Sequence, residues 1–144
     1  MIEAAATLYC KPIIKVENRI YKVEGKDILE VRVPEYTQKP VCALDEEGKA
    51  WAYIRIKDEN ILANPVHLKM WQHNQKEEVV MAYTDKEQSL LNLLRQHETL
   101  TLNQCCRLSR LPRRQMCELL ADFIRFELIE PVFKEHTFYY RLSK

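Results

Sequence analysis

Glycine is scarce in this 144-residue chain, which contains only two. An average usage of roughly 7% would give about ten. Phosphate-binding loops of the G-x-x-x-x-G-K-[ST] type and dinucleotide-binding turns of the G-x-G-x-x-G type need several glycines close together. Because Gly25 and Gly48 stand alone in separate polar stretches, a glycine-rich nucleotide site is excluded for these 144 residues.

Long apolar runs and paired cysteines are also missing. No run approaches eighteen apolar residues, and the N-terminal residues lack the basic and apolar regions of a signal peptide. The five cysteines are odd in number and form no C-x-x-C motif, which favours reduced, mostly buried thiols. We therefore expect a cytoplasmic protein without a membrane span.

The motifs of common catalytic and metal sites are absent as well. The four histidines are widely spaced, with no H-E-x-x-H motif and no cysteine pair at zinc-finger spacing. No serine lies in a G-x-S-x-G setting, and the acidic clusters at 45–47 and 58–59 fall in expected turns, where solvated carboxylates are usual. We expect no catalytic residue, no cofactor and no metal, and therefore no enzyme.

Charge is distributed unevenly along the chain, although the net charge is only +1. Residues 1–84 hold 12 basic and 13 acidic side chains, whereas residues 85–144 hold 10 and 8. Between positions 99 and 117 there are four arginines and no acid. The near-neutral total therefore conceals one basic segment in the second half.

The first half has the pattern of short strands. Runs rich in β-branched and aromatic residues cover residues 13–17, 19–23, 28–33 and 51–56. The polar stretches at 24–27 and 45–49 contain the two glycines and are expected to be hairpin loops. Short helices are expected at 1–9 and at 64–72, the second with Pro65 in its first turn.

The second half changes to helical periodicity. Asp85 is expected to cap a helix over 86–97, a second helix covers 102–108, and a third runs from about Pro112 to 126. Two β-like runs follow at 128–133 and 137–142. The whole chain is therefore predicted to be an α+β protein.

This succession of elements resembles the winged helix-turn-helix of bacterial regulators. Leu111, in the turn before the third helix, is placed to fill the gap between the second and third helices. Residues 99–101 are expected to supply the short strand against which the terminal hairpin, the wing, pairs. In such folds the third helix enters the major groove of DNA, so the resemblance implies a DNA-binding transcriptional regulator.

The residues predicted to contact DNA are mostly basic. Arg113, Arg114 and Gln115 lie off the apolar face of the third helix, where arginine can bind guanine and glutamine can bind adenine. Arg107 and Arg110 are placed to meet phosphates. The wing would add contacts from Lys134, His136 and Arg141.

Two acids on the third helix favour a different interpretation. Glu118 follows Arg114 at an ion-pair spacing, and Asp122 continues an acidic stripe that would repel phosphates. A winged helix that binds a protein or mediates oligomerisation is therefore the alternative.

The strand-rich half resembles another family. Its motif is Tyr53-Ile54-Arg55, then a polar turn at 57–60, then the small residue Ala63. This order, with the preceding strand at 26–34, resembles the C-terminal end of the Schlafen-type divergent AlbA domain, and the resemblance covers residues 1–72. It implies an incomplete AlbA-like module, followed by a linker at 73–84 and the winged helix at 85–144.

The AlbA resemblance lacks the first half of that domain. The family usually begins with an acidic-aromatic-Lys strand and a Gly-Gly hairpin, and neither is present in these residues. Nuclease activity known in some members is therefore not carried over, and a shortened remnant of a nucleic-acid-processing protein is a further alternative. The sheet edges of such a half-domain would be free to pair, which leaves a homodimer open.

Strand alternation also places several aromatic and basic side chains on one sheet face. Such a surface can stack bases and hold phosphates. The interpretation we favour is a face that packs on a helix, with its arginine paired to a carboxylate. The residues concerned are Trp51, Tyr53, Arg55 and Lys57.

Overall fold

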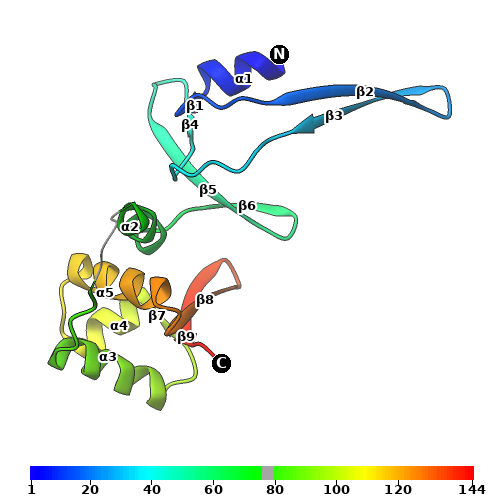
Figure 1. Cartoon of the computed structure of the whole chain (residues 1–144). Helices are drawn as coiled ribbons and strands as arrows, with labels where there is room; N and C mark the ends of the chain where they lie inside the picture. Colours follow the sequence, from blue (N-terminus) through cyan, green and yellow to red (C-terminus); the bar gives the residue numbers. More distant parts are fainter. Residues whose placement is uncertain (76–79) are drawn as a thin grey trace. The chain divides into compact units, whose positions relative to one another are not determined.

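The computed structural model describes residues 1–75 and 80–144, and it confirms the α+β class. Every strand pair among the described residues is antiparallel. Contacts divide the chain into two compact units, Met1–Ala63 and Asn64–Lys144. Each unit is described by itself below, as unit 1 and unit 2 (Figure 1).

Unit 1 contains one short helix and two separate sheets. Its four-stranded sheet has the order β1-β4-β5-β6, and β2 and β3 form a sheet of their own. The elements are α1 (Ile2–Leu8), β1 (Cys10–Lys11), β2 (Glu17–Val23), β3 (Lys26–Arg32), β4 (Cys42–Leu44), β5 (Ala50–Ile56) and β6 (Glu59–Leu62).

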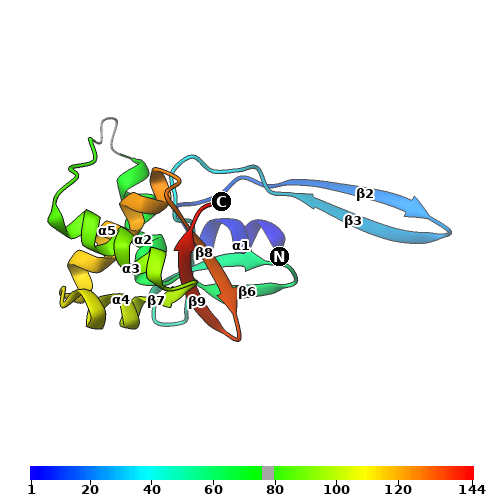
Figure 2. The ribbon, with the colours of Figure 1, turned by 90° about the horizontal axis from the view of Figure 1, so that it is seen from below.

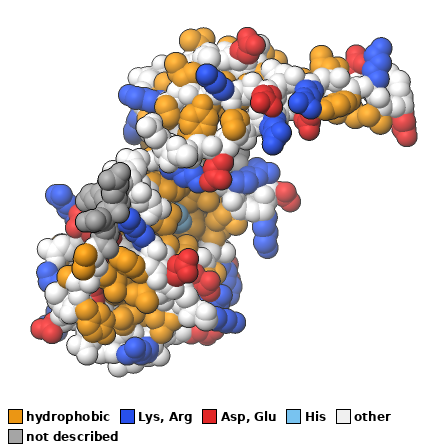
Figure 3. Space-filling model, viewed as in Figure 1, with side chains coloured by type: hydrophobic (Ala, Val, Ile, Leu, Met, Phe, Trp, Pro, Cys, Tyr) orange, Lys and Arg blue, Asp and Glu red, His pale blue; other side chains and the backbone are white. Residues whose placement is uncertain are grey.

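The hairpin of β2 and β3 has no other element of unit 1 beside it in either ribbon view (Figures 1 and 2). Glu24 (φ 50°) and Gly25 (φ 76°) form its turn, and positive φ at both positions is typical of a type I′ turn. Every residue of both strands is exposed. Apolar and charged side chains are interspersed along the hairpin (Figure 3).

The strand expected at 13–17 was wrong for residues 13–16. Their backbone is bound by partners other than a neighbouring strand. The Lys15 amide donates to the Tyr36 hydroxyl at 2.9 Å, and the Ile14 amide donates to the Ala6 carbonyl at 3.1 Å. These long-range partners satisfy the backbone of an apolar run that local pattern alone assigns to a sheet.

Unit 2 has the predicted succession of helix, strand, short helix, turn, longer helix and hairpin. Its three-stranded sheet has the order β7-β9-β8. The elements are α2 (Pro65–Asn74), α3 (Asp85–Gln96), β7 (Leu100–Thr101), α4 (Leu102–Ser109), α5 (Arg113–Arg125), β8 (Ile129–Lys134) and β9 (Thr137–Leu142).

The core of unit 2 is built on α5. Met116, Leu120 and Phe123 follow its helical period and are fully buried, as are Leu90 of α3 and Tyr140 of β9. Leu111 packs against this core from the turn before α5, in agreement with the sequence prediction. Burial of this stripe gives α5 one apolar face and leaves its other side for contacts outside the core.

The first helix of the predicted winged helix begins with a different cap from the one expected. Thr84, rather than Asp85, is the N-cap of α3. The Thr84 amide donates to Glu87 Oε2 at 2.8 Å, which forms one half of a capping box. Asp85 is instead the first residue of the helix, where its negative charge suits the helix dipole.

The helix over 65–74 lies in unit 2, whereas the sequence placed it with the N-terminal module. α2 packs along α5, and Val66 of α2 is fully buried in the core of unit 2. The contact boundary therefore follows Ala63 instead of residue 72. Residues 76–79 of the expected 73–84 linker lie outside the described residues. Within 1–75 and 80–144, no helix is both long and apolar enough to span a bilayer.

Candidate nucleic-acid interface

The first turn of α5 presents the three side chains predicted to reach bases. Arg113, Arg114 and Gln115 are all exposed, and this turn contains no acid. Arg113 Nη1 donates to Asn103 Oδ1 at 2.6 Å, and Gln115 Oε1 accepts from Lys86 Nζ at 3.5 Å. The end of the helix that carries the positive pole of the dipole is therefore also rich in hydrogen-bond donors.

Two further arginines flank this turn. Arg107 lies on α4, and Arg110 follows that helix in the left-handed conformation (φ 56°, ψ 28°) that commonly ends a helix. Both side chains are exposed. The helix-turn-helix segment thus gathers four exposed cations without an intervening acid, as the sequence predicts.

The acids of α5 are paired with α2. Glu118 Oε1 lies 3.3 Å from Lys69 Nζ and 3.6 Å from Arg114 Nε. Asp122 Oδ1 lies 2.6 Å from His73 Nδ1. The acidic stripe that argued against phosphate binding is therefore matched by side chains of a neighbouring helix.

Sequence reasoning missed Lys69 and His73 as members of this surface. Lys69 and His73 are four residues apart on α2, and their partners Glu118 and Asp122 are four residues apart on α5. This equal spacing was the available signal, since side chains four residues apart lie on one helix face.

α2 is held in place by a buried polar network. Asn64 Oδ1 accepts from the His67 amide at 3.0 Å and lies 2.8 Å from His67 Nδ1. Asn64 Nδ2 donates to the Tyr140 hydroxyl at 2.9 Å. Burial lowers the pKa of His67 to about 4, so the ring is neutral at pH 7 and donates its Nδ1 proton to Asn64. The network ties the start of α2 to β9.

The hairpin of β8 and β9 places its three predicted residues differently. Lys134 and His136 are exposed, and His136 (φ 59°) belongs to a turn with Glu135 (φ 51°) of the type I′ class. Arg141 is half-buried, and its Nε lies 2.6 Å from Glu130 Oε1 on the facing strand. Arg141 is therefore engaged within the sheet, whereas the other two side chains lie at or next to the tip.

In unit 1, alternation along β5 does place Trp51, Tyr53 and Arg55 on one face. Lys57 does not join them, because the strand ends at Ile56 and Lys57 (φ 52°) lies in the turn. The predicted four-residue face is therefore one residue too long.

Local bonds engage two of these side chains. Trp51 Nε1 donates to Asp45 Oδ2 at 2.8 Å. Arg55 Nη1 donates to Asn60 Oδ1 at 3.1 Å and Arg55 Nη2 lies 4.0 Å from Asp58 Oδ1, which agrees with the expected carboxylate partner. Tyr53 remains 51% exposed. This face carries fewer available cations than the helix-turn-helix segment of unit 2.

Among the described residues no group of three or more His, Cys, Asp or Glu side chains is arranged to hold a metal ion. Comparison of the chain with protein-family models, with curated proteins and with solved structures found no match.

Proposed function

We propose that unit 2 is a winged helix-turn-helix domain that binds duplex DNA, and that the protein is a transcriptional regulator. The observation that carries the proposal is the cluster of four exposed arginines at the junction of α4 and α5. The three-stranded sheet β7-β9-β8 beside these helices supports it, because this is the arrangement in which a hairpin acts as a wing.

Each part of the cluster has a distinct role in this proposal. Arg113, Arg114 and Gln115 read base edges in the major groove. Arg107 and Arg110 bind phosphates on either side of it. Lys134 and His136, at the end of the hairpin, reach the backbone or the adjacent minor groove. Arg141 contributes less to DNA binding in this proposal, because its guanidinium is paired with the Glu130 carboxylate.

The pairing of α2 with α5 limits which part of the helix meets DNA. Lys69 and His73 hold the flank that contains Glu118 and Asp122. The first turn of α5 remains exposed, and recognition helices commonly contact bases with their N-terminal residues. We infer that α5 approaches the groove end-on, with its first turn foremost.

Protein interaction is the second candidate function. One flank of α5 already packs on a helix of its own chain, so α5 carries a surface on which a helix can pack. This candidate predicts no salt-dependent affinity for DNA, so one titration separates the two.

The test is a fluorescence-anisotropy titration of the full chain with duplexes from a random-sequence selection, at several salt concentrations. If about four phosphates are contacted, log Kd should change with log salt with a slope of about 3 to 4. Arg113→Gln combined with Arg114→Gln should weaken binding about 10-fold or more, because two charge-assisted base contacts are lost.

The matched control changes two exposed cations of unit 2 outside the helix-turn-helix segment, Arg95→Gln with Lys144→Gln. Equal weakening by both double variants would mean that only net charge matters and that these arginines do not read DNA. No binding at 50 mM salt would eliminate the DNA proposal and leave protein interaction.

A further inference from the structure

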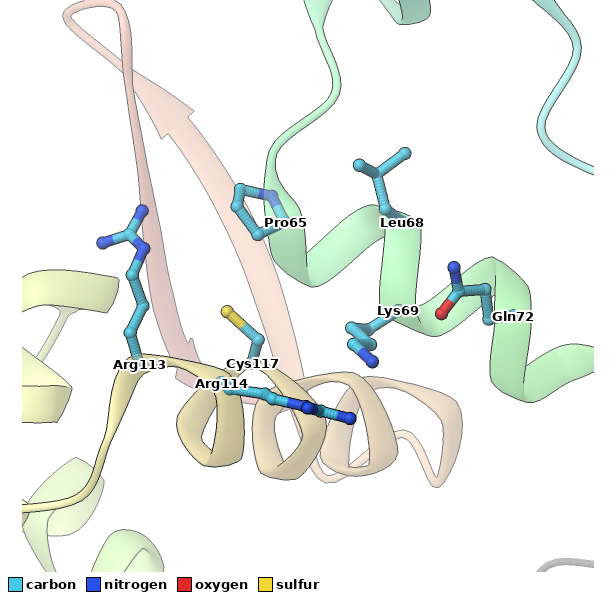
Figure 4. A pocket seen from close by; sticks show the side chains of 7 residues that line it. All are labelled: Pro65, Leu68, Lys69, Gln72, Arg113, Arg114 and Cys117. Carbon is cyan, nitrogen blue, oxygen red and sulfur yellow. The ribbon is translucent and has the colours of Figure 1, made fainter.

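A cavity of about 520 Å³ lies between α2 and the first half of α5. This volume is within the range of about 300 to 1,000 Å³ that is usual for small-molecule sites. Lys69 projects from α2 toward α5, and the Cys117 thiol points from α5 toward α2 (Figure 4). Both helices belong to unit 2, so one compact unit builds the whole cavity.

The charged part of the cavity lining is cationic. Lys69, Arg113 and Arg114 line it, and no acidic residue is among its described lining residues. Glu118 lies nearby and interacts with both Lys69 and Arg114, so one carboxylate is shared by two of the three cations. Arg113 uses Nη1 on the neutral Asn103 and keeps its other N–H donors. A surplus of positive charge is therefore available to an anion.

Apart from Gln72, the remaining lining is apolar. Pro65 and Leu68 contribute carbon surface from α2, and Cys117 contributes a thiol that is 3% exposed. Burial raises the pKa of Cys117, so the thiol is uncharged near neutral pH and does not repel an anion. An inorganic ion would leave this apolar surface unused, whereas a molecule with an apolar body would cover it.

We propose that this cavity binds a small organic anion that combines one phosphate or carboxylate group with an apolar body. The anionic group lies against Lys69 and Arg114, which both reach the same oxygen of Glu118, and the body lies against Pro65, Leu68 and Cys117. The regulatory consequence rests on the proposed function, in which Arg113 and Arg114 bind DNA. Because both arginines also line the cavity, the ligand and the duplex compete for them.

The test uses phenyl phosphate as the probe, with the full chain labelled with ¹⁵N and no DNA present. Phenyl phosphate should shift the amide signals of Leu68, Lys69 and Cys117 in a saturable way, with a Kd of about 1 mM or tighter. Benzyl alcohol, which lacks the charge, and inorganic phosphate, which lacks the body, should each bind about tenfold more weakly or worse.

Two single variants test the cations, with controls matched in chemistry. Lys69→Met and Arg114→Gln should each raise the Kd for phenyl phosphate about tenfold. Lys134→Met and Arg95→Gln, which lie outside the cavity lining, should leave it unchanged. The amide spectrum of each variant reports directly whether its fold is retained.

The outcomes separate this proposal from DNA binding. Saturable phenyl phosphate binding that disappears with Lys69→Met supports the cavity even if no duplex binds. Shifts confined to other residues, or equal binding of benzyl alcohol, would overturn the cavity while leaving any measured DNA affinity intact. If both proposals hold, saturating phenyl phosphate should raise the Kd for DNA about tenfold in the anisotropy assay.

Discussion

At the residue scale, His67 couples the position of α2 to pH. Its side chain is 6% exposed, its ring centroid lies 4.8 Å from that of Phe138, and its Nδ1 bonds to Asn64. Burial lowers its pKa from 6.5 to about 4, because the charged imidazolium loses its hydration in this site. The folded protein therefore favours the neutral ring.

Lowering the pH from 6.5 to 4 should destabilise unit 2 through this residue. The unfolded chain binds a proton at His67 in this window and the folded chain does not, so the free energy of unfolding falls as pH falls. A shift of this size corresponds to a loss of up to about 3 kcal/mol. Urea denaturation at pH 7.0 and pH 4.5 measures it.

His67→Phe is the variant that isolates the effect. It loses the bond to Asn64 and should be less stable at pH 7, but its stability should fall less between the two pH values. His97→Asn, at an exposed position, should keep the wild-type dependence. A His67→Phe protein with an unchanged pH dependence would assign the loss to other groups.

At the element scale, α4 depends on reciprocal bonds at its first turn. Thr101 Oγ1 accepts from the Gln104 amide at 3.2 Å, and Gln104 Oε1 accepts from the Thr101 amide at 2.8 Å. The same threonine pairs with Tyr139 in the sheet. One residue therefore ends β7 and begins α4, so it sets where the sheet meets the helix-turn-helix segment.

Thr101→Ala should lower the free energy of unfolding by about 1 kcal/mol, because the capping hydroxyl is lost. Chemical denaturation followed by circular dichroism measures the change. Thr101→Ser keeps the hydroxyl and should cost clearly less. Equal losses in the two variants would place the effect in the methyl group of threonine instead of in the cap.

At the scale of the whole molecule, the two units differ in how much they bury. Among the described residues of unit 2, fourteen buried residues form one continuous core, which includes Phe123 and Tyr140. In unit 1, all of whose residues the structure describes, the buried hydrophobic residues are Ala6 and Ala52. A two-stranded hairpin with exposed faces, such as β2 and β3, adds little stability of its own.

Residues 64–144 should therefore fold alone with one cooperative transition, and residues 1–63 should not. A chain of residues 73–144, which begins at the boundary expected from sequence, lacks residues 65–72 of α2. It should be less stable than 64–144 by about 2 kcal/mol or more, because buried Val66 and the ion pair between Lys69 and Glu118 are lost. Urea denaturation of the three chains measures their stability. Equal stability of 64–144 and 73–144 would contradict the boundary after Ala63.

Local chemistry in the sequence was enough to predict most elements of this protein. The helical period of α5, the β-branched and aromatic residues of β5 and the turn at Gly25 depend on side chains a few residues apart. Each could therefore be predicted from the sequence alone. The four arginines near α5 were also found this way, because helix and turn residues close in sequence lie close in space. Their role in binding DNA stays a prediction.

Tertiary structure alone decided which elements belong together. Residues 13–16 have strand-like composition, but Tyr36 and Ala6 take their backbone bonds. α2 has no strong apolar stripe of its own, so its partner became visible only in the fold, where Lys69 and His73 meet the acids of α5. Contacts between residues about fifty positions apart leave no local periodicity, and for that reason the unit boundary, the paired acids and the cavity beside Arg113 required the structure.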